Sequence, residues 1–212
     1  MTERQEGIEA ILKLAPVVPV LVIDEVAAAV PLARALVAGG LKAIEVTFRT
    51  EAALESIRAI AAEVEGAVVG AGTVLTAAQV DQAVDAGCRF MVSPGAAPDL
   101  LAAAKDCPLP LLPGAATASE AMSLLEQGYG FQKFFPAEPA GGTAYLKSLA
   151  SPLAGVRFCP TGGISRDSAA DYLALPNVVC VGGSWVAPAD KVAEGAWKDI
   201  EALAFDAAGL KP

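Results

Sequence analysis

The stretch "AIEVTFRTEAALESIRAIAAEVEGAVVGAGT", residues 43–73, decides the fold. It opens with the short β-type run "AIEVTF", continues with a segment of helical period up to Val64, and ends in a second apolar run, "AVVGAGT". Thr50, directly before the helical segment, is a residue type that commonly begins a helix. A strand, a helix and another strand in this order predict two parallel strands joined by a crossover helix.

The same unit recurs over nearly the whole chain. The other β-type runs are "PVVPVLVI", "FMVSPG", "PLPLLPG", "GFQKFFP", "RFCPTGG" and "VVCVGGS", and helical segments separate them. Thr76 stands where a helix is expected to begin, and Gly39, Gly87 and Gly128 stand where helices are expected to end. Eight strands alternating with helices predict the α/β class and one (β/α)8 TIM barrel domain over residues 1–212. A leading helix, from about Glu3 to Leu14, is expected to cap one end.

An open, doubly wound sheet is the competing arrangement. Its dinucleotide-binding form requires the pattern G-x-G-x-x-G directly after the first strand, whereas Asp24, Glu25 and Val26 stand there. The strand count and this missing motif favour the barrel.

Composition argues against several classes of partner. A net charge of −9 over 212 residues disfavours nucleic acid, because such a surface repels phosphates. The early apolar run at residues 14–23 is too short to span a bilayer and is interrupted by Pro16 and Pro19. The four cysteines are far apart in the sequence without a C-x-x-C pair, as in proteins of a reducing cytoplasm. We therefore expect a cytoplasmic protein with neither a membrane nor a nucleic-acid partner.

The sequence contains no histidine. No imidazole is available as a general base or as a metal ligand, and a zinc site would need scattered cysteines and carboxylates. We expect no metal and no cofactor, and we expect Glu, Asp, Lys or Tyr to carry any acid–base chemistry.

Polar residues and glycines collect where the predicted strands end. The segments concerned are residues 45–49, 70–73, 93–95, 113–114, 133–136, 160–163 and 182–184. In a (β/α)8 barrel the active site lies at the carboxyl ends of the strands, and glycine lets the backbone approach a ligand closely. The sequence therefore predicts a ligand site at this end.

Lys133, in "FQKFFPAEPAGG" (residues 131–142), is the only lysine within an apolar strand segment. Burial among aromatic rings disfavours the charged form of an amine and makes a nucleophilic free amine available. The alternative is a structural lysine paired with a carboxylate. Glu45 is the one acidic residue within a strand core, and side-chain alternation turns both residues toward the barrel interior. Glu45 is then either a proton shuttle or the structural counter-ion of a nearby cation.

Two further groups could hold a substrate. Arg49 and Thr73 suit a carboxylate, although Arg49 could simply open the following helix. "PTGGIS" and "VGGSW" follow the last two strands, where many barrels bind phosphate through loop amides. The second group comprises Ser184 and the amides of Gly162, Gly163 and Gly183, and its alternative role is to form tight turns.

Other polar or aromatic residues receive no site role. Glu138 could compete with Glu45 as a base, but loop carboxylates are usually solvated. Tyr145, Tyr172, Trp185 and Trp197 are expected to pack in the core, and the structure can test each of these expectations.

The motifs "EVTFRT", "GAGTVL", "SPG", "LLPG", "KFFPAE", "RFCPTGGIS" and "VGGSW" resemble those of the 2-keto-3-deoxy-6-phosphogluconate (KDPG)/4-hydroxy-2-oxoglutarate aldolase family, from about Pro16 to beyond Trp185. The resemblance implies a class I (Schiff-base), metal-independent carbon–carbon lyase on a (β/α)8 barrel, usually a homotrimer. It implies cleavage of KDPG to pyruvate and D-glyceraldehyde 3-phosphate in the Entner–Doudoroff pathway of carbohydrate metabolism.

The resemblance also implies a role for each matching residue. It makes Lys133 the Schiff-base lysine and Glu45 the general acid/base. The remaining residues are implied to bind substrate: Arg49, Thr73 and Thr161 at the pyruvate carboxylate, Pro94 and Phe135 along the pocket wall, and Gly162, Gly163 and Ser184 at the phosphate.

The chemistry of the residues agrees with this resemblance. Metal-dependent aldolases commonly hold their cation with histidines, so a chain without histidine favours an iminium formed by a lysine amine as the electron sink. Cleavage of 4-hydroxy-2-oxoglutarate to pyruvate and glyoxylate, alone or as a second activity, stays open, as does the galactonate-derived isomer of KDPG. A non-catalytic phosphate-binding barrel is the alternative from another class.

Overall fold

Parallel strands alternate with helices along the described part of the chain, residues 3–211 of the computed structural model. The strands are β1 (Val17–Leu21), β2 (Ala43–Thr47), β3 (Val68–Gly72), β4 (Phe90–Val92), β5 (Leu111–Leu112), β6 (Gly114–Ala115), β7 (Phe131–Phe134), β8 (Arg157–Pro160) and β9 (Val181–Gly183). The helices are α1 (Glu3–Leu12), α2 (Val26–Ala38), α3 (Ala53–Glu63), α4 (Ala77–Asp85), α5 (Pro98–Asp106), α6 (Ala118–Glu126), α7 (Gly142–Leu149), α8 (Ala169–Leu173), α9 (Ala189–Ala193) and α10 (Trp197–Ala208). This alternation confirms the predicted α/β class.

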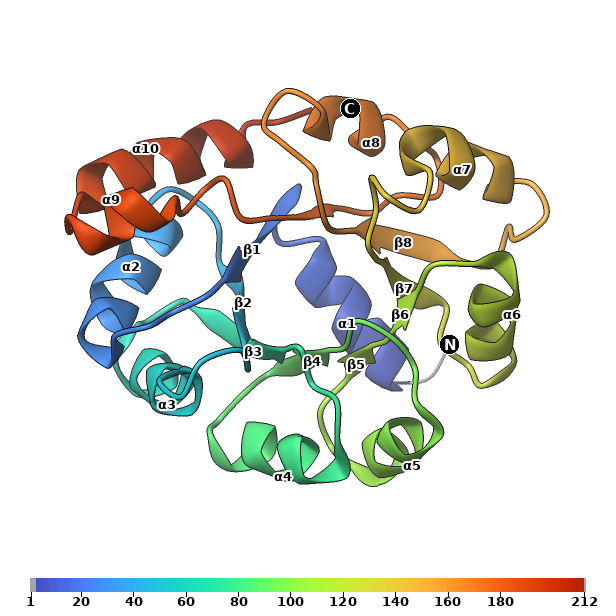
Figure 1. The fold of residues 1–212 in the computed structure, drawn as a ribbon, viewed down its shortest axis with the longest axis horizontal. Coiled ribbons are helices and arrows are strands. Elements are labelled where there is room, and N and C mark those ends of the chain that lie inside the picture. Colours follow the sequence, from blue (N-terminus) through green and yellow to red (C-terminus); the bar gives the residue numbers. More distant parts are fainter. Residues whose placement is uncertain (1–2, 212) are drawn as a thin grey trace.

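The strands form a curled parallel sheet of the order β5-β4-β3-β2-β1-β9 and a second parallel sheet of the order β6-β7-β8. Figure 1 shows the strands around the centre of the molecule with most of the helices outside them. Isolated parallel bridges at Phe158–Val178 and Thr161–Gly182 connect the β8 and β9 segments. The fold is therefore a half-barrel of six strands, with the three-stranded sheet beside it.

The predicted strand "PLPLLPG" is present as two pieces, β5 and β6, on either side of Pro113. Proline has no amide hydrogen to donate to a sheet, so a strand is interrupted where it stands. The Pro113 carbonyl still accepts a hydrogen bond from the Lys133 amide at 2.8 Å. The break therefore divides one predicted strand without separating it from β7.

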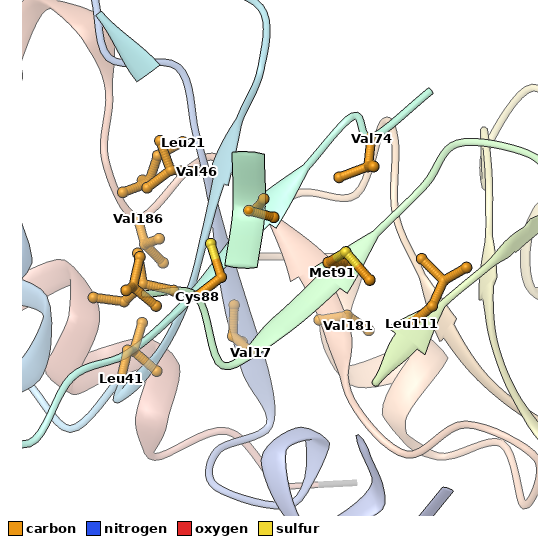
Figure 2. Packing of buried hydrophobic residues seen from close by; sticks show 14 of the residues in the cluster. Val17, Leu21, Leu41, Val46, Val74, Cys88, Met91, Leu111, Val181 and Val186 are labelled. Carbon is orange, nitrogen blue, oxygen red and sulfur yellow. The ribbon is translucent and has the colours of Figure 1, made fainter. Parts of the chain in front are cut away.

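Side chains on the two faces of the strands enter different hydrophobic clusters. Outward residues such as Ile44 and Phe134 pack with the surrounding helices. In Figure 2, Leu21 and Val46, which are partners on neighbouring strands, lie side by side in this outer cluster. The inward residues form what we call the interior cluster: Ile8, Leu12, Val18, Ala43, Phe90, Val92, Leu112, Phe131, Cys159 and Cys180. Alternation along each strand thus separates the helix-facing core from the interior.

Helix α1 packs against the amino-terminal half of this interior. Ile8 and Leu12 are 0% and 1% exposed, and both belong to the interior cluster. The Gln5 Oε1 atom accepts hydrogen bonds from the amides of Gly130 and Phe131, at the beginning of β7. The helix therefore lies against the ends of the strands opposite the predicted site, and Figure 1 shows it crossing behind the strands.

The predicted helices are present, although α1 ends at Leu12 and not near Leu14, and α8 is limited to Ala169–Leu173. Thr76 begins α4 as expected, since its hydroxyl accepts a hydrogen bond from the Gln79 amide. The expectation for Thr50 is wrong: α3 begins at Ala53 after Ala52, without a side-chain cap. The Thr50 hydroxyl instead donates to the Ile23 carbonyl at 2.5 Å and ties the β2 loop to the β1 loop. Among residues 3–211, no helix is long and apolar enough to cross a membrane.

Candidate active site

Lys133 and Glu45 form a buried ion pair between β7 and β2. The Lys133 Nζ atom lies 3.2 Å from Glu45 Oε1, and each side chain is only 4% exposed. The two strands face one another across the centre of the molecule (Figure 1). Alternation turns both side chains inward, because Phe131 and Ala43, two residues earlier on the same strands, belong to the interior cluster. The structure thus brings together the two residues that the sequence predicts as catalytic.

Space for the Glu45 carboxylate comes from Gly72 on the neighbouring strand β3. A Cβ atom at this position would overlap the Glu45 side chain, including its carboxylate. Gly70 serves the same purpose for the Phe90 ring, whose Cε1 atom lies 2.5 Å from where a Cβ would stand. These glycines therefore make room for neighbouring side chains, a role that the sequence alone did not indicate.

The wall beside the amine is aromatic. The Lys133 Nζ atom lies 5.3 Å from the centre of the Phe135 ring, within the range of a cation–π contact. Phe135 is half-buried, as is Pro94 at the end of β4. The Ser93 hydroxyl donates to the Gly95 carbonyl at 2.7 Å and holds the turn that carries Pro94.

Arg49 and Thr73 meet at the mouth of the site. The Arg49 Nε atom donates to Thr73 Oγ1 at 3.2 Å. Thr73 has a φ of +56°, and no other non-glycine residue in the described range has a positive φ. Strained backbone of this kind is concentrated at functional sites. The Arg49 guanidinium is exposed and has further N–H groups with which to bind a carboxylate.

Thr161, at the end of β8, is 6% exposed, and its hydroxyl has no hydrogen-bond partner among the described residues. Gly182 on the β9 side leaves the space that this hydroxyl occupies, since a Cβ at Gly182 would overlap Oγ1. Buried hydroxyls without a partner are uncommon in proteins. Thr161 therefore carries a buried hydroxyl that residues 3–211 leave unpaired.

The turn after β8 is the predicted phosphate site. Gly162 and Gly163 have φ values of +105° and +81°, a backbone conformation that favours glycine. The loop after β7 fastens this turn: the Ala137 amide donates to the Thr161 carbonyl at 2.8 Å, and the Glu138 amide donates to the Gly162 carbonyl at 3.0 Å. Ser184 is exposed at the end of β9, so its hydroxyl is accessible to a ligand.

Glu138 and Tyr172 form a contact that the sequence did not predict. Tyr172 is fully buried, as expected of a packing residue, but its hydroxyl donates to Glu138 Oε1 at 2.6 Å. Burial, and then the Glu138 carboxylate, raise the pKa of Tyr172 far above its usual value. Glu138 is exposed, as expected of a loop carboxylate, but this hydrogen bond also holds one of its oxygens. Strand periodicity could not indicate this pair, because Glu138 lies in the loop after β7 and Tyr172 lies on α8.

Within residues 3–211, no group of three or more Cys, Asp and Glu side chains is placed to hold a metal ion. The Cys159 and Cys180 thiols meet in the interior cluster, where their hydrogen bond and burial raise the pKa of Cys180.

The model of the family described as "KDPG and KHG aldolase" matches residues 8–203, which is most of the chain. The chain belongs to this family. Its curated relatives include the KHG/KDPG aldolase of Escherichia coli, which is 51% identical over 94% of this chain and 93% of its own length.

Two solved aldolase structures have the same fold. The KDPG aldolase of Zymomonas mobilis with 3-phosphoglycerate is 53% identical, covers 98% of this chain and 97% of its own, and has a TM-score of 0.92. The KDPG aldolase of Legionella pneumophila, with pyruvate captured as a covalent carbinolamine intermediate, is 42% identical with a TM-score of 0.93, over 98% of this chain and 99% of its own. The family resemblance inferred from the motifs is therefore confirmed.

Proposed function

We propose that this chain is a class I aldolase that cleaves 2-dehydro-3-deoxy-6-phosphogluconate to pyruvate and D-glyceraldehyde 3-phosphate. The observation that carries the proposal is the buried Lys133–Glu45 pair, whose Nζ and Oε1 atoms lie 3.2 Å apart in the interior that the strands surround. A lysine amine beside a carboxylate can form a Schiff base with a ketone, because the carboxylate takes and returns the protons. The covalent carbinolamine in the Legionella pneumophila relative supports this chemistry.

The reaction begins at Lys133. Glu45 first takes a proton from the Lys133 ammonium of the ion pair. The free amine attacks the C2 ketone to give a carbinolamine, which loses water to form an iminium. Glu45 protonates the departing hydroxyl and then takes the proton from the C4 hydroxyl. The C3–C4 bond breaks, its electron pair moves into the iminium, and the aldehyde leaves. Protonation of the resulting enamine at C3 and hydrolysis then release pyruvate and restore the Lys133 amine.

The surrounding groups orient the substrate. Arg49, Thr73 and the Thr161 hydroxyl face the carboxylate end, and Phe135 and Pro94 form the apolar wall beside the Lys133 amine. The phosphate is placed against Gly162, Gly163 and Ser184, where backbone N–H groups can bind it without a lysine. Separate groups for a carboxylate and for a phosphate support a substrate that is a keto acid with an anionic group at each end.

The fold and assembly that accompany this function are a closed (β/α)8 barrel, forming one domain over residues 1–212, in a cytoplasmic homotrimer that needs neither metal nor cofactor. β5 and β6, interrupted only at Pro113, count as one strand of eight. The hydrogen bond from the Lys133 amide to Pro113 and the two bridges between β8 and β9 support closure on both sides.

Cleavage of 4-hydroxy-2-oxoglutarate to pyruvate and glyoxylate is a second candidate activity. The Escherichia coli relative carries both activities in its name, KHG/KDPG aldolase. Both substrates share the pyruvate portion that Lys133 would bind, and they differ at the phosphorylated end. The ratio of kcat/KM for the two substrates measures the preference.

Borohydride trapping with pyruvate tests the proposal. Hydride reduces an iminium to a stable secondary amine, so the intact mass should increase by one pyruvate-derived group, and peptide mapping should place it on Lys133. Lys133→Met should give no adduct, whereas Lys13→Met, at an exposed lysine that also pairs with a glutamate, should behave as the wild type. A folded wild-type protein without an adduct at several pH values would contradict the aldolase and favour the non-catalytic phosphate-binding barrel.

A further inference from the structure

The loop after β7 places a carboxylate next to the proposed phosphate site. The Glu138 amide bonds the Gly162 carbonyl, and the Glu138 Cβ and Cγ atoms lie 2.8 Å from where a Gly163 Cβ would stand. The stem of Glu138 therefore packs on the Gly162–Gly163 turn. A carboxylate free to move here would repel a phosphate, and it could occupy the same backbone N–H groups.

Tyr172 restrains that carboxylate. Its hydroxyl donates to Glu138 Oε1 at 2.6 Å, and its ring is fully buried in the outer hydrophobic cluster. A hydrogen bond to an ionised acceptor is among the stronger ones, and a buried ring keeps its donor in a fixed position. The hydroxyl is protonated at neutral pH and able to donate, since burial and the Glu138 carboxylate raise the pKa of Tyr172 from its ordinary value of 10.0.

The carboxylate points toward α7 and not toward the turn. Its Oε2 atom lies 3.6 Å from the position of a Cβ at Gly142, the first residue of α7, and the Tyr172 hydroxyl oxygen lies 3.3 Å from the same position. The atoms nearest to a Cβ at Gly163 are instead the Cβ, Cγ and Cα of Glu138. The stem of Glu138 thus supports the turn, while its charge lies beside the start of the helix, where a negative charge is favourable.

We propose that Tyr172 is a positioning residue for substrate specificity, which holds the Glu138 carboxylate beside α7 and so keeps the Gly162–Gly163 amides free for the phosphorylated end of the substrate. This inference rests on the proposed function. It gives a role to two residues that do not touch the reacting atoms.

The first test is the steady-state kinetics of Tyr172→Phe with the phosphorylated keto acid. Loss of the hydroxyl frees the carboxylate, so KM should rise about tenfold while kcat changes less than about threefold. The pyruvate concentration that gives half-maximal borohydride trapping should stay unchanged, because pyruvate has no phosphate. Tyr145→Phe is the matched control: it removes a hydroxyl that accepts a bond from the Ala118 amide, and it should leave KM unchanged.

Charge removal separates the proposal from a general loss of structure. Glu138→Gln keeps an oxygen acceptor for Tyr172 and should leave KM at or below the wild-type value. Combined with Tyr172→Phe, it should return KM to within about twofold of wild type, since no carboxylate remains to repel the phosphate. Glu138→Asp, whose shorter side chain falls short of the hydroxyl, should raise KM with the Tyr172 ring still in place, so the test does not depend on the folding of Tyr172→Phe.

Titration calorimetry with inorganic phosphate measures phosphate binding at the Gly162–Gly163 turn without catalysis. Affinity should fall about tenfold in Tyr172→Phe and recover in the double variant. An unchanged KM in folded Tyr172→Phe or in Glu138→Asp, or an increase that Glu138→Gln does not reverse, would overturn the inference. A wild-type protein that binds phosphate but forms no pyruvate adduct would contradict only the proposed function.

Discussion

Two neighbouring layers inside the molecule have opposite chemistry. Phe131 and Ala43 lie in the interior cluster, against α1. Two residues further along the same strands, Lys133 and Glu45 form an ion pair with 4% exposed side chains. One step of the side-chain alternation therefore separates a layer that stabilises the fold from a layer that can react.

The buried position of the ion pair is weak evidence of a stabilising role. Removing two charges from water costs several kcal/mol each, so a buried pair is often no more stable than apolar residues of similar size. The interior cluster shows that apolar residues fill this space readily. A charged pair at the carboxyl ends of the strands agrees with the catalytic role proposed for it, and substitutions in each layer can test the two layers separately.

Lys133→Met should have the largest effect. It removes the only amine of the ion pair, and we expect kcat for pyruvate release to fall by about 10⁴-fold or more. A coupled assay with lactate dehydrogenase measures the pyruvate formed. Substantial residual turnover in purified, folded protein would contradict the Schiff-base role of Lys133.

The same change leaves the Glu45 carboxylate buried without its partner, which should lower the free energy of unfolding by about 3–5 kcal/mol. The double variant Lys133→Met/Glu45→Gln should recover most of that stability and remain inactive. Urea unfolding followed by circular dichroism measures the free energy of unfolding of the single and the double variant. If the double variant regained activity, the ion pair would not be the reacting group.

Glu45→Gln should lower kcat by about 10²–10⁴-fold, because an amide of the same shape cannot exchange protons with the substrate. The exchange of pyruvate methyl hydrogens for deuterium, followed by NMR, should slow with it, since that exchange requires protonation of the enamine. Glu55→Gln, at an exposed glutamate paired with Arg58, is the matched control and should change neither rate. A wild-type exchange rate in Glu45→Gln would leave Glu45 as a structural counter-ion only.

Ile8→Ala changes the apolar layer alone. Ile8 is fully buried on α1, and its truncation should lower the free energy of unfolding by about 2–5 kcal/mol. The kcat/KM of the folded fraction should stay within about twofold of wild type, because Ile8 lies near the amino-terminal ends of the strands and the site lies at their carboxyl ends. Leu14→Ala, at a side chain 42% exposed, should cost less than about 1 kcal/mol. A large fall in kcat in Ile8→Ala would show that the two layers are coupled.

Much of this arrangement could be predicted because it follows from periodicity. Alternation along "GFQKFFP" and "AIEVTF" turns Lys133 and Glu45 inward, and parallel strands bring their carboxyl ends together. Periodicity thus predicts that these two residues share the mouth of the barrel, and the structure supplies their separation of 3.2 Å.

Contacts made by loop residues could not be predicted in the same way. The bond from Tyr172 to Glu138 and the bond from Thr50 to the Ile23 carbonyl depend on loop conformations that no repeat describes. The positive φ of Thr73 is a further case, since threonine rarely adopts it and only the surrounding structure can impose it. These features fix the loops around the site, whereas the strand–helix repeat sets the positions of Lys133 and Glu45.

The smallest predicted effect concerns neither layer, but the outer helix α6. The Glu120 carboxylate accepts hydrogen bonds from the amides of Ala116 at 2.8 Å and Thr117 at 2.9 Å, and the bond from Ala116 above all lowers the pKa of Glu120 from its ordinary 4.5. The native state therefore gives up this proton more readily than the unfolded chain. The resulting stabilisation is present above pH 4.5 and is lost as the pH falls below that value, through the native pKa.

Glu120→Gln should accordingly lower Tm by about 1 °C at pH 7, a small value because Glu120 is exposed to solvent. At pH 3 the difference from wild type should shrink, since the wild-type carboxylate is then increasingly protonated. Glu126→Gln, at the other end of α6, removes a carboxylate from the negative end of the helix and should not lower Tm. Kinetic constants should be unchanged in both variants. An equal loss of Tm at both pH values would mean that the shape of the capping side chain, and not its charge, stabilises α6.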